Sequence, residues 1–354
     1  MKHLLILTPE PVQGASSRLR AIDLIPYWSK SMKVRHLAFL SPRSYHLKDQ
    51  PGHLIAKIMS VLFDACRFVV LFPFYLFGAD VVLVHRNVAP LGPPIFEWLA
   101  KLFSHKFIYD FDDAIYLNPA SARNRWLGPL KMNAFRTRWL TASADTVIVG
   151  NQYLANYAKQ FNDQVLVVPT GLDVESYSAL REKEGPVVIG WIGGPGTSDF
   201  VRVLLPELVR ILNAYPNVEV HLVGDDFGDC HARLKSIAWS LDTELSCMQA
   251  FSIGINPLQD NDFTRGKCGF KVIQYHALGI PVVSSPVGVC EEQIAVGVDG
   301  YFATSDLDWY EALSQLVSDG ALRQRMGKAS KKSADNYRSE DVARQVLEEA
   351  LLVL

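Results

Sequence analysis

Short apolar runs alternate with longer amphipathic stretches along the chain. The runs are rich in valine and isoleucine, and most end in glycine, proline, aspartate or asparagine, which is typical of parallel strands buried on both faces. Such runs lie at residues 3–9, 34–40, 81–86, 106–112 and 146–151 in the first half of the chain, and at 164–170, 186–193, 218–224, 251–258 and 280–285 in the second. Helix-length stretches, such as residues 198–215, separate them. The pattern predicts an α/β fold with doubly wound parallel sheets.

The strand–helix pattern runs twice, and a segment rich in proline, glycine and charge separates its two parts near residues 168–186. A chain of 354 residues is longer than one hydrophobic core normally serves. We therefore expect an N-terminal Rossmann-like domain at residues 1–170 and a C-terminal one at 173–336, with a closing helix at 337–354 that packs back on the first. Because ligands of such sheets bind beyond the carboxyl ends of the strands, the expected site is a cleft between the two domains.

The composition is that of an ordinary globular protein, with 49% hydrophobic and 20% charged residues and a formal net charge of −2. This charge gives no general attraction to nucleic acid, so no nucleic-acid partner is expected and any anion site must be local. The five cysteines contain no CxxC pair, which argues against a disulfide framework or a zinc site and fits a cytoplasmic protein. The first apolar run is too short for a signal peptide, and we interpret it as a buried strand.

Two segments have a composition compatible with a membrane surface. Residues 54–77 are the most apolar part of the chain. Charged residues interrupt them, and the uncharged stretch that remains is too short to span a bilayer. A buried helix is the preferred interpretation, and a membrane-surface helix is the alternative. Residues 123–140 combine basic and aromatic side chains, for which a solvated helix face is preferred over a membrane-surface face. These side chains are Arg123, Arg125, Trp126, Lys131, Arg136, Arg138 and Trp139.

The segment from Arg265 to Gly288 carries the strongest candidate site for an anion. A helix is expected to begin near Gly269, and a helix N-terminus binds phosphate through its free N–H groups and its dipole. Gly266 and Gly269 would let the backbone approach a ligand closely. The side chains expected to assist are Arg265, Lys267, Lys271 and Gln274. The alternative is an ordinary turn and helix with solvated lysines.

A second glycine-rich turn follows the strand expected at residues 186–193. The backbone around Gly193 and Gly194 would be open enough to cradle a diphosphate, and Thr197 or Ser198 is expected to cap the next helix. The alternative is a tight strand–helix turn without a ligand. The segment GGPGTSD lacks the GxGxxG spacing of a dinucleotide-binding fingerprint, so a nicotinamide enzyme is a poor fit.

Polar side chains also follow the strands of the N-terminal half. Asp110, Asp112 and Asp113 lie at one strand end, where carboxylates can bind sugar hydroxyls, act as a base on an acceptor, bind a metal, or cap a helix and form a salt bridge. His85 and Arg86 lie at another, and they can equally be structural.

The loop after the first strand contains a further glycine. Gly14 is followed by Ser16, Ser17 and Arg18, whose polar side chains are candidates for contact with a ligand at the end of this strand. A capped helix with exposed arginines explains the same residues equally well.

The segment at residues 265–292 resembles the nucleotide-sugar signature of family 4 glycosyltransferases, which have the GT-B fold. The matching residues are Lys271, Gln274, Tyr275, Ala277, Gly279, Pro281, Val282, Val283, Gly288 and Glu292. Residues 167–177 are similar to the interdomain linker of that family, with Gly171 and Asp173 matching. The resemblance covers most of the chain from Val147 onward.

This resemblance implies a transferase that moves a sugar from a nucleoside-diphosphate sugar to a glycan or lipid-linked acceptor, with retention and without metal or other cofactor. It suggests cell-surface polysaccharide synthesis, in the cytoplasm or peripherally at the inner face of the cell membrane. The implied donor-binding residues are Gly14, Arg18, Gly193, Gly194, Thr197, Lys267, Gly269, Phe270, Lys271, Gln274 and Glu292. Asp112, His85 and Lys271 are the candidate catalytic residues, and Arg86, Asp110 and Asp113 are candidates on the acceptor side.

The chain departs from the family at four positions. Gly266 and Gln274 stand where the family has two glutamates, and Gly194 and Asp199 where it has a phosphate-binding arginine and lysine. Our hypothesis is that Arg265, Lys267 and Lys271, and more weakly Arg202, neutralise the diphosphate instead. Two alternatives remain open, a sugar-nucleotide epimerase of the same fold and a non-catalytic sugar-nucleotide-binding subunit.

Overall fold

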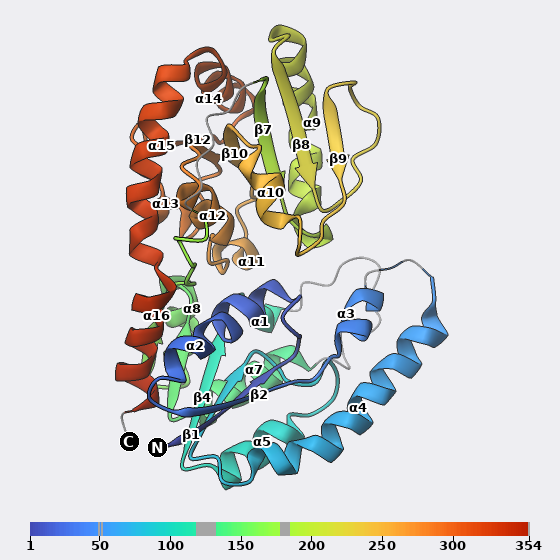
Figure 1. Cartoon of the computed structure of the whole chain (residues 1–354), viewed down its shortest axis with the longest axis vertical. Coiled ribbons are helices and arrows are strands. Elements are labelled where there is room, and N and C mark those ends of the chain that lie inside the picture. Colours follow the sequence, from blue (N-terminus) through green and yellow to red (C-terminus); the bar gives the residue numbers. More distant parts are fainter. Residues whose placement is uncertain (49, 51, 118–131, 178–184, 353–354) are drawn as a thin grey trace. The chain divides into compact units, whose positions relative to one another are not determined.

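The computed structural model describes residues 1–48, 50, 52–117, 132–177 and 185–352. The chain divides into two compact units (Figure 1). Unit 1 comprises Met1–Gly171, Gly266–Cys268 and Ser339–Leu354, and unit 2 comprises Leu172–Arg265 and Gly269–Arg338. Each unit has one six-stranded, entirely parallel sheet. The predicted α/β class with doubly wound parallel sheets is therefore confirmed, and all ten predicted strands are present.

The sheet of unit 1 has the order β2-β1-β3-β4-β5-β6. Its strands are β1 His3–Thr8, β2 Lys33–Ala38, β3 Val81–His85, β4 Lys106–Phe111, β5 Thr146–Val149 and β6 Val165–Val167. Every residue of β3 and β4 is buried, because helices cover both faces of the sheet and apolar side chains can therefore point either way. The strand order reverses between β1 and β3, so the carboxyl ends of these two strands form a switch point, where ligands of such sheets bind.

The helices of unit 1 include one from the far end of the chain. They are α1 Ala15–Arg20, α2 Ile25–Trp28, α3 Pro42–Lys48, α4 Leu54–Leu76, α5 Ile95–Phe103, α7 Asn133–Ser143, α8 Gln152–Ala158 and α16 Ser339–Val346. Figure 1 shows α16 beside α2, and the indole of Trp28 donates a hydrogen bond to the carbonyl of Ala343 over 2.9 Å. Val342 and Val346 belong to the same buried cluster as Trp28.

Two expectations for the helices of unit 1 are corrected. The preferred interpretation of residues 54–77 as a buried helix is wrong, because α4 buries only Asp64, Phe68, Phe72 and Leu76. Arg136 is not on a solvated face, since its side chain is fully buried and pairs with Glu97 across 3.2 Å. Residues 123–131 lie outside the described residues. Within the described part of the chain, no helix is long and apolar enough to cross a membrane.

Unit 2 has the sheet order β12-β11-β10-β7-β8-β9, with its switch point between β7 and β10. The strands are β7 Val187–Ile192, β8 Val218–Val223, β9 Leu234–Ile237, β10 Ile253–Asn256, β11 Val282–Ser284 and β12 Gly300–Phe302. Strands β9 and β12 extend the sheet beyond the predicted ones. The helices are α9 Pro195–Ala214, α10 Glu244–Gln249, α11 Asp262–Arg265, α12 Phe270–Ala277, α13 Cys290–Gln293, α14 Asp306–Ser318 and α15 Gly320–Ala334.

Two strand glycines let aromatic rings pack directly on the backbone in the centre of unit 2. A side chain at Gly190 of β7 would overlap the ring of Phe251. A side chain at Gly254 of β10 would come within 2.5 Å of the ring of Tyr275. The close approach of rings to strands explains why glycine interrupts two otherwise apolar strands.

Replacing Gly190 with alanine is expected to lower the free energy of unfolding by about 2–3 kcal/mol, because the buried Phe251 ring has to move away from the new methyl group. Urea denaturation followed by circular dichroism measures the effect. Gly196→Ala is the matched control, since no atom lies within 4 Å of the methyl group added in the first turn of α9. Equal losses in the two variants would contradict the packing described here.

Candidate functional site

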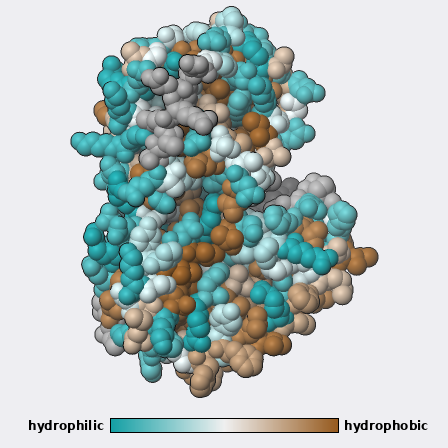
Figure 2. Space-filling view, viewed as in Figure 1, coloured by the Kyte–Doolittle hydropathy of each residue, from teal (hydrophilic) through white to brown (hydrophobic). Residues whose placement is uncertain are grey.

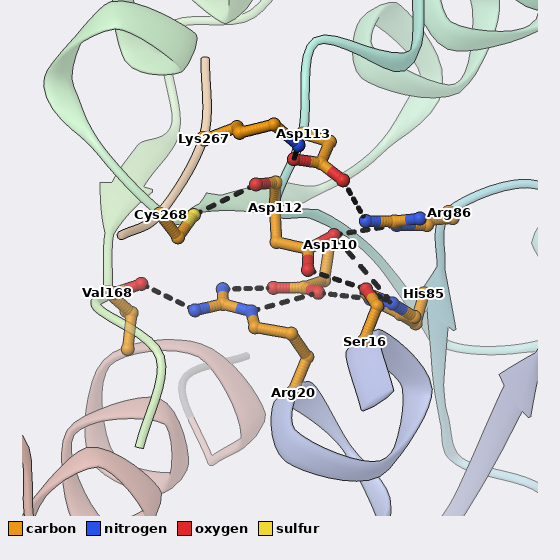
Figure 3. A network of polar contacts seen from close by, with 10 residues as sticks. All are labelled: Ser16, Arg20, His85, Arg86, Asp110, Asp112, Asp113, Val168, Lys267 and Cys268. Atoms are coloured by element: carbon orange, nitrogen blue, oxygen red, sulfur yellow. Dashed lines mark hydrogen bonds and ion pairs between the residues drawn. The ribbon is translucent and has the colours of Figure 1, made fainter. Parts of the chain in front are cut away.

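A polar network lies at the carboxyl ends of β1, β3 and β4 in unit 1 (Figure 3). His85 ends β3, and Asp110 lies in β4 with Asp112 just beyond it. Successive residues of a strand point to opposite faces, so Asp110 and Asp112 share a side of the chain. Ser16 and Arg20 come from α1, where residues four apart lie on one helix face. The network therefore forms at the switch point of the sheet.

Asp110 is the buried centre of this network, with 2% of its surface exposed. Its carboxylate accepts a hydrogen bond from Arg20 Nη2 at 2.5 Å, and His85 Nδ1 lies 2.6 Å away. Burial opposes ionisation of Asp110, but the Arg20 guanidinium and His85 outweigh that cost and lower the pKa of the carboxyl below its ordinary value. Arg20 also donates to the carbonyl of Val168 over 2.7 Å, so both Asp110 and Arg20 are held rigidly.

Asp112 is more accessible, with 12% of its side chain exposed. It accepts hydrogen bonds from Ser16 Oγ at 2.5 Å and from Arg86 Nε at 2.6 Å. Burial again opposes ionisation, but the charges of Arg86 and His85 prevail and lower the pKa of this carboxyl well below its usual range. The Asp112 carboxylate is thus a fixed negative charge and a weak base near neutral pH.

The donors and acceptors around His85 identify its role. Ser16 Oγ donates a hydrogen bond to Asp112 and lies 2.9 Å from His85 Nε2. The other ring nitrogen, Nδ1, is in contact with Asp110. Both ring nitrogens are therefore engaged, and His85 is fully buried. In this structure His85 positions Ser16 and Asp112, and its assignment as a catalytic residue stays a prediction.

Arg86 and Lys267 flank the acidic cluster. Arg86 has a left-handed backbone, with φ of 55°, and pairs with both Asp112 and Asp113. Lys267 Nζ lies 3.8 Å from Asp113 Oδ1. The side-chain amide of Asn151 donates a hydrogen bond of 2.9 Å to the backbone carbonyl of Lys267. Lys267 therefore belongs to the acidic cluster of unit 1, rather than to the helix start of α12 with which the sequence places it.

Two glycines in unit 1 have a packing reason. A side chain at Gly266 would come within 2.7 Å of Ala114, and one at Gly14 would overlap Glu10. Gly14 precedes α1 without a side-chain cap, which contradicts the alternative of a capped helix. Arg18 is half-buried in α1. The predicted close approach of Gly266 to a phosphate is thus replaced by a close approach to Ala114.

In unit 2, Lys271 lies against the glycine-rich turn that follows β7. If residue 193 carried a Cβ atom, that atom would lie 2.9 Å from Lys271 Cε and 2.9 Å from Thr197 Oγ1. Lys271 Nζ also lies 5.6 Å from the centre of the Trp191 ring. Helix α9 begins here with Gly194 as N-cap, which corrects the expected cap at Thr197 or Ser198. A cation and the positive end of a 20-residue helix thus meet at the carboxyl end of β7.

Helix α12 begins at Phe270, as predicted, with Gly269 in a left-handed conformation, φ 61°. The space beside Gly269 is filled by Gln293, since any side chain at Gly269 would overlap it. Phe270 packs against a buried cluster that contains Leu172 and Ala334. These contacts explain the glycine and the phenylalanine by packing.

Gln274 is buried, with 4% of its surface exposed. Its amide donates to Glu244 over 3.0 Å and to Tyr177 over 3.1 Å, and the expected contact of Gln274 with a ribose stays a prediction. Glu244 also accepts a hydrogen bond from the indole of Trp239 at 3.0 Å. Glu292 is exposed on α13.

Two of the proposed substitutes for the missing phosphate-binding charges have carboxylate partners nearby. Arg265 pairs with Asp260 through contacts of 2.6 and 2.9 Å. Arg202 pairs with Asp225 at 3.0 Å. In the part of the chain that the structure describes, no three His, Cys, Asp or Glu side chains converge as metal ligands.

The sequence analysis did not identify Arg20, which pairs with Asp110, or Glu244, which accepts a hydrogen bond from Gln274. The signal for Arg20 was its position one helical turn after Ser16. No local signal marks Glu244, which lies 30 residues before Gln274.

Residues 186–319 match a family model described as glycosyl transferases group 1. The D-inositol 3-phosphate glycosyltransferase of Corynebacterium urealyticum is 23% identical over 218 residues, which are 52% of this chain and 50% of that protein. The chain thus spans about half the length of this curated relative.

Solved structures resemble the whole chain. HepE of Anabaena, determined with UDP and glucose, has a TM-score of 0.72 at 16% identity and covers 100% of both chains. Sucrose-phosphate synthase from Thermosynechococcus elongatus has a TM-score of 0.70 at 14% identity and covers 98% of both. These likenesses, with the two parallel sheets, show the GT-B fold.

Replacing Asp110 with asparagine is expected to cost about 3–5 kcal/mol of stability at pH 7, because it leaves the buried Arg20 without its counter-charge. The pKa of Asp110 is lower in the folded state than in the unfolded state, where it is about 4. Its ionised carboxylate therefore contributes to the free energy of unfolding above that pH, and this contribution is lost as the pH falls through the folded-state pKa. Urea denaturation between pH 3 and 7 should therefore show a smaller loss of stability with acid in the variant. Arg344→Gln, which breaks an exposed pair with Asp341, should change stability by less than about 1 kcal/mol.

Proposed function

We propose that this chain, a glycosyltransferase of the GT-B fold with a group 1 domain at residues 186–319, transfers a sugar from a nucleoside-diphosphate sugar to a glycan or lipid-linked acceptor. The observation that carries the proposal is the position of Lys271 against the glycine-rich turn at the switch point of unit 2. HepE, which shares the fold, has been determined with UDP-glucose and with UDP, which supports a donor of this class.

We assign the diphosphate of the donor to the end of β7. The N-terminus of α9 offers a positive dipole end, and glycine at position 193 leaves room for Lys271 and Thr197 to pack against the turn. Lys271 adds a full positive charge at the same place. A fixed cation and fixed dipoles stabilise the charge that develops on a departing nucleoside diphosphate, so this arrangement promotes breakage of the bond between sugar and phosphate.

We assign the sugar or acceptor hydroxyls to Asp112 in unit 1. Its carboxylate stays ionised because Arg86 and Ser16 hold it, and it is more exposed than Asp110. A fixed negative charge stabilises an oxocarbenium-like centre and accepts hydrogen bonds from hydroxyl groups. Its lowered pKa makes it a poor base, so we assign the proton of the acceptor to the departing phosphate and name no protein nucleophile.

Retention of configuration, independence of metal, and a role in cell-surface polysaccharide synthesis are parts of this proposal that follow from the resemblance to family 4. So is a cytoplasmic location, peripheral at the inner face of the cell membrane. An enzyme that delivers sugars to lipid-linked acceptors works where those acceptors lie, and contact with a membrane surface is consistent with that requirement.

Replacing Lys271 with alanine is expected to weaken the binding of UDP by about 10- to 100-fold, which corresponds to the loss of one charged hydrogen bond. Isothermal titration calorimetry measures the change. Lys332→Ala, which removes an exposed lysine of α15, is the control and should leave affinity unchanged. Unchanged affinity in the Lys271 variant would refute the assignment of the diphosphate site.

Replacing Asp112 with asparagine is expected to lower kcat on the order of 10²-fold while the affinity for UDP stays within about twofold, because the two groups serve different parts of the reaction. Since Asp112 is ionised well below neutral pH, its protonation should produce no fall in kcat between pH 8 and 5. Steady-state kinetics across this range test both statements. A fall of UDP affinity in parallel with kcat would contradict the division of roles.

The donor base is identified by a thermal-shift screen with nucleoside diphosphates, because a ligand that binds only the folded state raises Tm. Incubation with the matching sugar nucleotide then separates the alternatives. Release of nucleotide that depends on an acceptor indicates transfer, whereas a change of the sugar without release indicates an epimerase.

A further inference from the structure

Unit 1 carries a large exposed apolar face on α4 and α5, which we call the α4–α5 face. On α4 it consists of Leu54, Ile55, Ile58, Met59, Leu62, Phe63, Val69, Val70 and Phe74, each between 51% and 78% exposed, and Phe77 directly after the helix is 86% exposed. On α5 it consists of Ile95, Trp98, Leu99, Leu102 and Phe103. Figure 2 shows apolar side chains gathered along the lower edge of unit 1, over these helices.

The exposed apolar residues recur with the period of a helix. On α5 the spacing from Ile95 through Trp98, Leu99 and Leu102 is that of a single helix stripe. On α4, Ile55, Met59, Leu62 and Val69 follow one another at steps of four, three and seven residues, which also places them on one stripe. Both helices thus carry an outward apolar stripe, and on α4 it comes in addition to the buried Phe68, Phe72 and Leu76.

Polar groups fasten the opposite side of α4 to unit 1. Asp64 accepts hydrogen bonds from the backbone and hydroxyl of Ser41, at 2.8 and 3.0 Å. Arg67 donates to the carbonyls of Ala38 and Phe39, each at 2.7 Å. These bonds hold α4 along the surface of unit 1 and prevent it from inserting upright into a bilayer.

The two helices form one continuous surface. Phe96 of α5 packs against Phe68 and Phe72 of α4, with ring centroids 4.7 and 5.3 Å apart. A helix of 23 residues is roughly 34 Å long, so the face extends over a large part of unit 1. A contiguous apolar surface of this size on a soluble protein marks an interaction site.

The lack of polar groups on the two helices identifies what the face binds. Asp64 and Glu97 are the only acidic residues of α4 and α5, and both are fully buried. The basic side chains are already engaged, since Lys57 and Arg67 donate to backbone carbonyls and Lys101 pairs with Asp145 across 2.6 Å. A protein interface normally contains about one hydrogen bond per 100–200 Å², but the exposed stripes present almost no polar side chain that could form one. A broad apolar face of this kind matches the acyl boundary of a bilayer surface.

We propose that the α4–α5 face docks on a lipid bilayer surface, with both helices parallel to the membrane plane. This inference rests on the peripheral location proposed above and identifies the surface responsible for it. Docking is driven by apolar burial, so it needs neither nucleotide nor sugar, and it survives salt concentrations that screen charges.

Flotation of the full chain with vesicles of phosphatidylcholine and 30% phosphatidylglycerol tests the proposal. The wild-type chain is expected to float with the vesicles at 0.1 M NaCl and, at least half as well, at 1 M NaCl. The double variant Phe63→Glu, Phe74→Glu is expected to lose binding at least tenfold. The matched control is Val203→Glu, Leu307→Glu, which places two glutamates on exposed apolar positions of unit 2 and should float like the wild type.

Cys66 offers a measurement that keeps every apolar side chain of the face, because it is itself exposed among these residues on α4. A polarity-sensitive dye on Cys66, with Cys230 replaced by serine, should shift to the blue on addition of vesicles. The same dye on Cys230 of unit 2, with Cys66 replaced by serine, should not.

Three outcomes overturn the inference. They are no flotation of the wild type, equal flotation of the two double variants, and a vesicle-free dimer that the Phe63, Phe74 variant dissociates while vesicles bind neither form. Binding of UDP, measured on the same proteins without vesicles, keeps the two proposals separate. Flotation failure with intact UDP binding refutes the docking surface alone, and flotation without UDP binding refutes the proposed function alone.

Discussion

The ionised carboxylate of Asp110 is the constraint on which the polar edge of unit 1 depends. A buried negative charge is stable only with a close counter-charge and full hydrogen bonding, and Arg20 and His85 supply both. Asp112, two residues further along the chain, is held by Ser16 and Arg86 and remains ionised as a fixed negative charge. An apolar core of similar size would cost less, so we attribute the network to the need for a charge in a defined position.

The two units use different physical means at equivalent places in their sheets. Unit 1 gathers charged side chains at its switch point, whereas unit 2 offers a glycine-rich turn, a helix N-terminus and one lysine. Carboxylates suit hydroxyl groups and a developing positive charge, and dipoles with a cation suit a diphosphate. This division of chemistry agrees with a reaction that separates a sugar from a nucleoside diphosphate.

Strand positions could be predicted because burial on both faces leaves a continuous apolar run, and all ten predicted strands formed. Strands β9 and β12 have no such run, because two of the four residues of β9 are polar and exposed and β12 contains only three residues, one of them glycine. The candidate site was predictable as residue types at strand ends, since parallel topology brings those ends together. The buried partners of those residues were not, because Gln274 meets Glu244 only through folding.

The sequence by itself determined the fold class, the ten strands, the glycine-rich turns and the residues that carry charge at the strand ends, because these follow from local periodicity and spacing. Only the tertiary structure decided which of these residues are accessible. It buried His85, Asp110 and Gln274, moved Lys267 to the acidic cluster, and left one side of α4 uncovered. Burial depends on what packs against a residue from distant parts of the chain, and no local pattern contains that information.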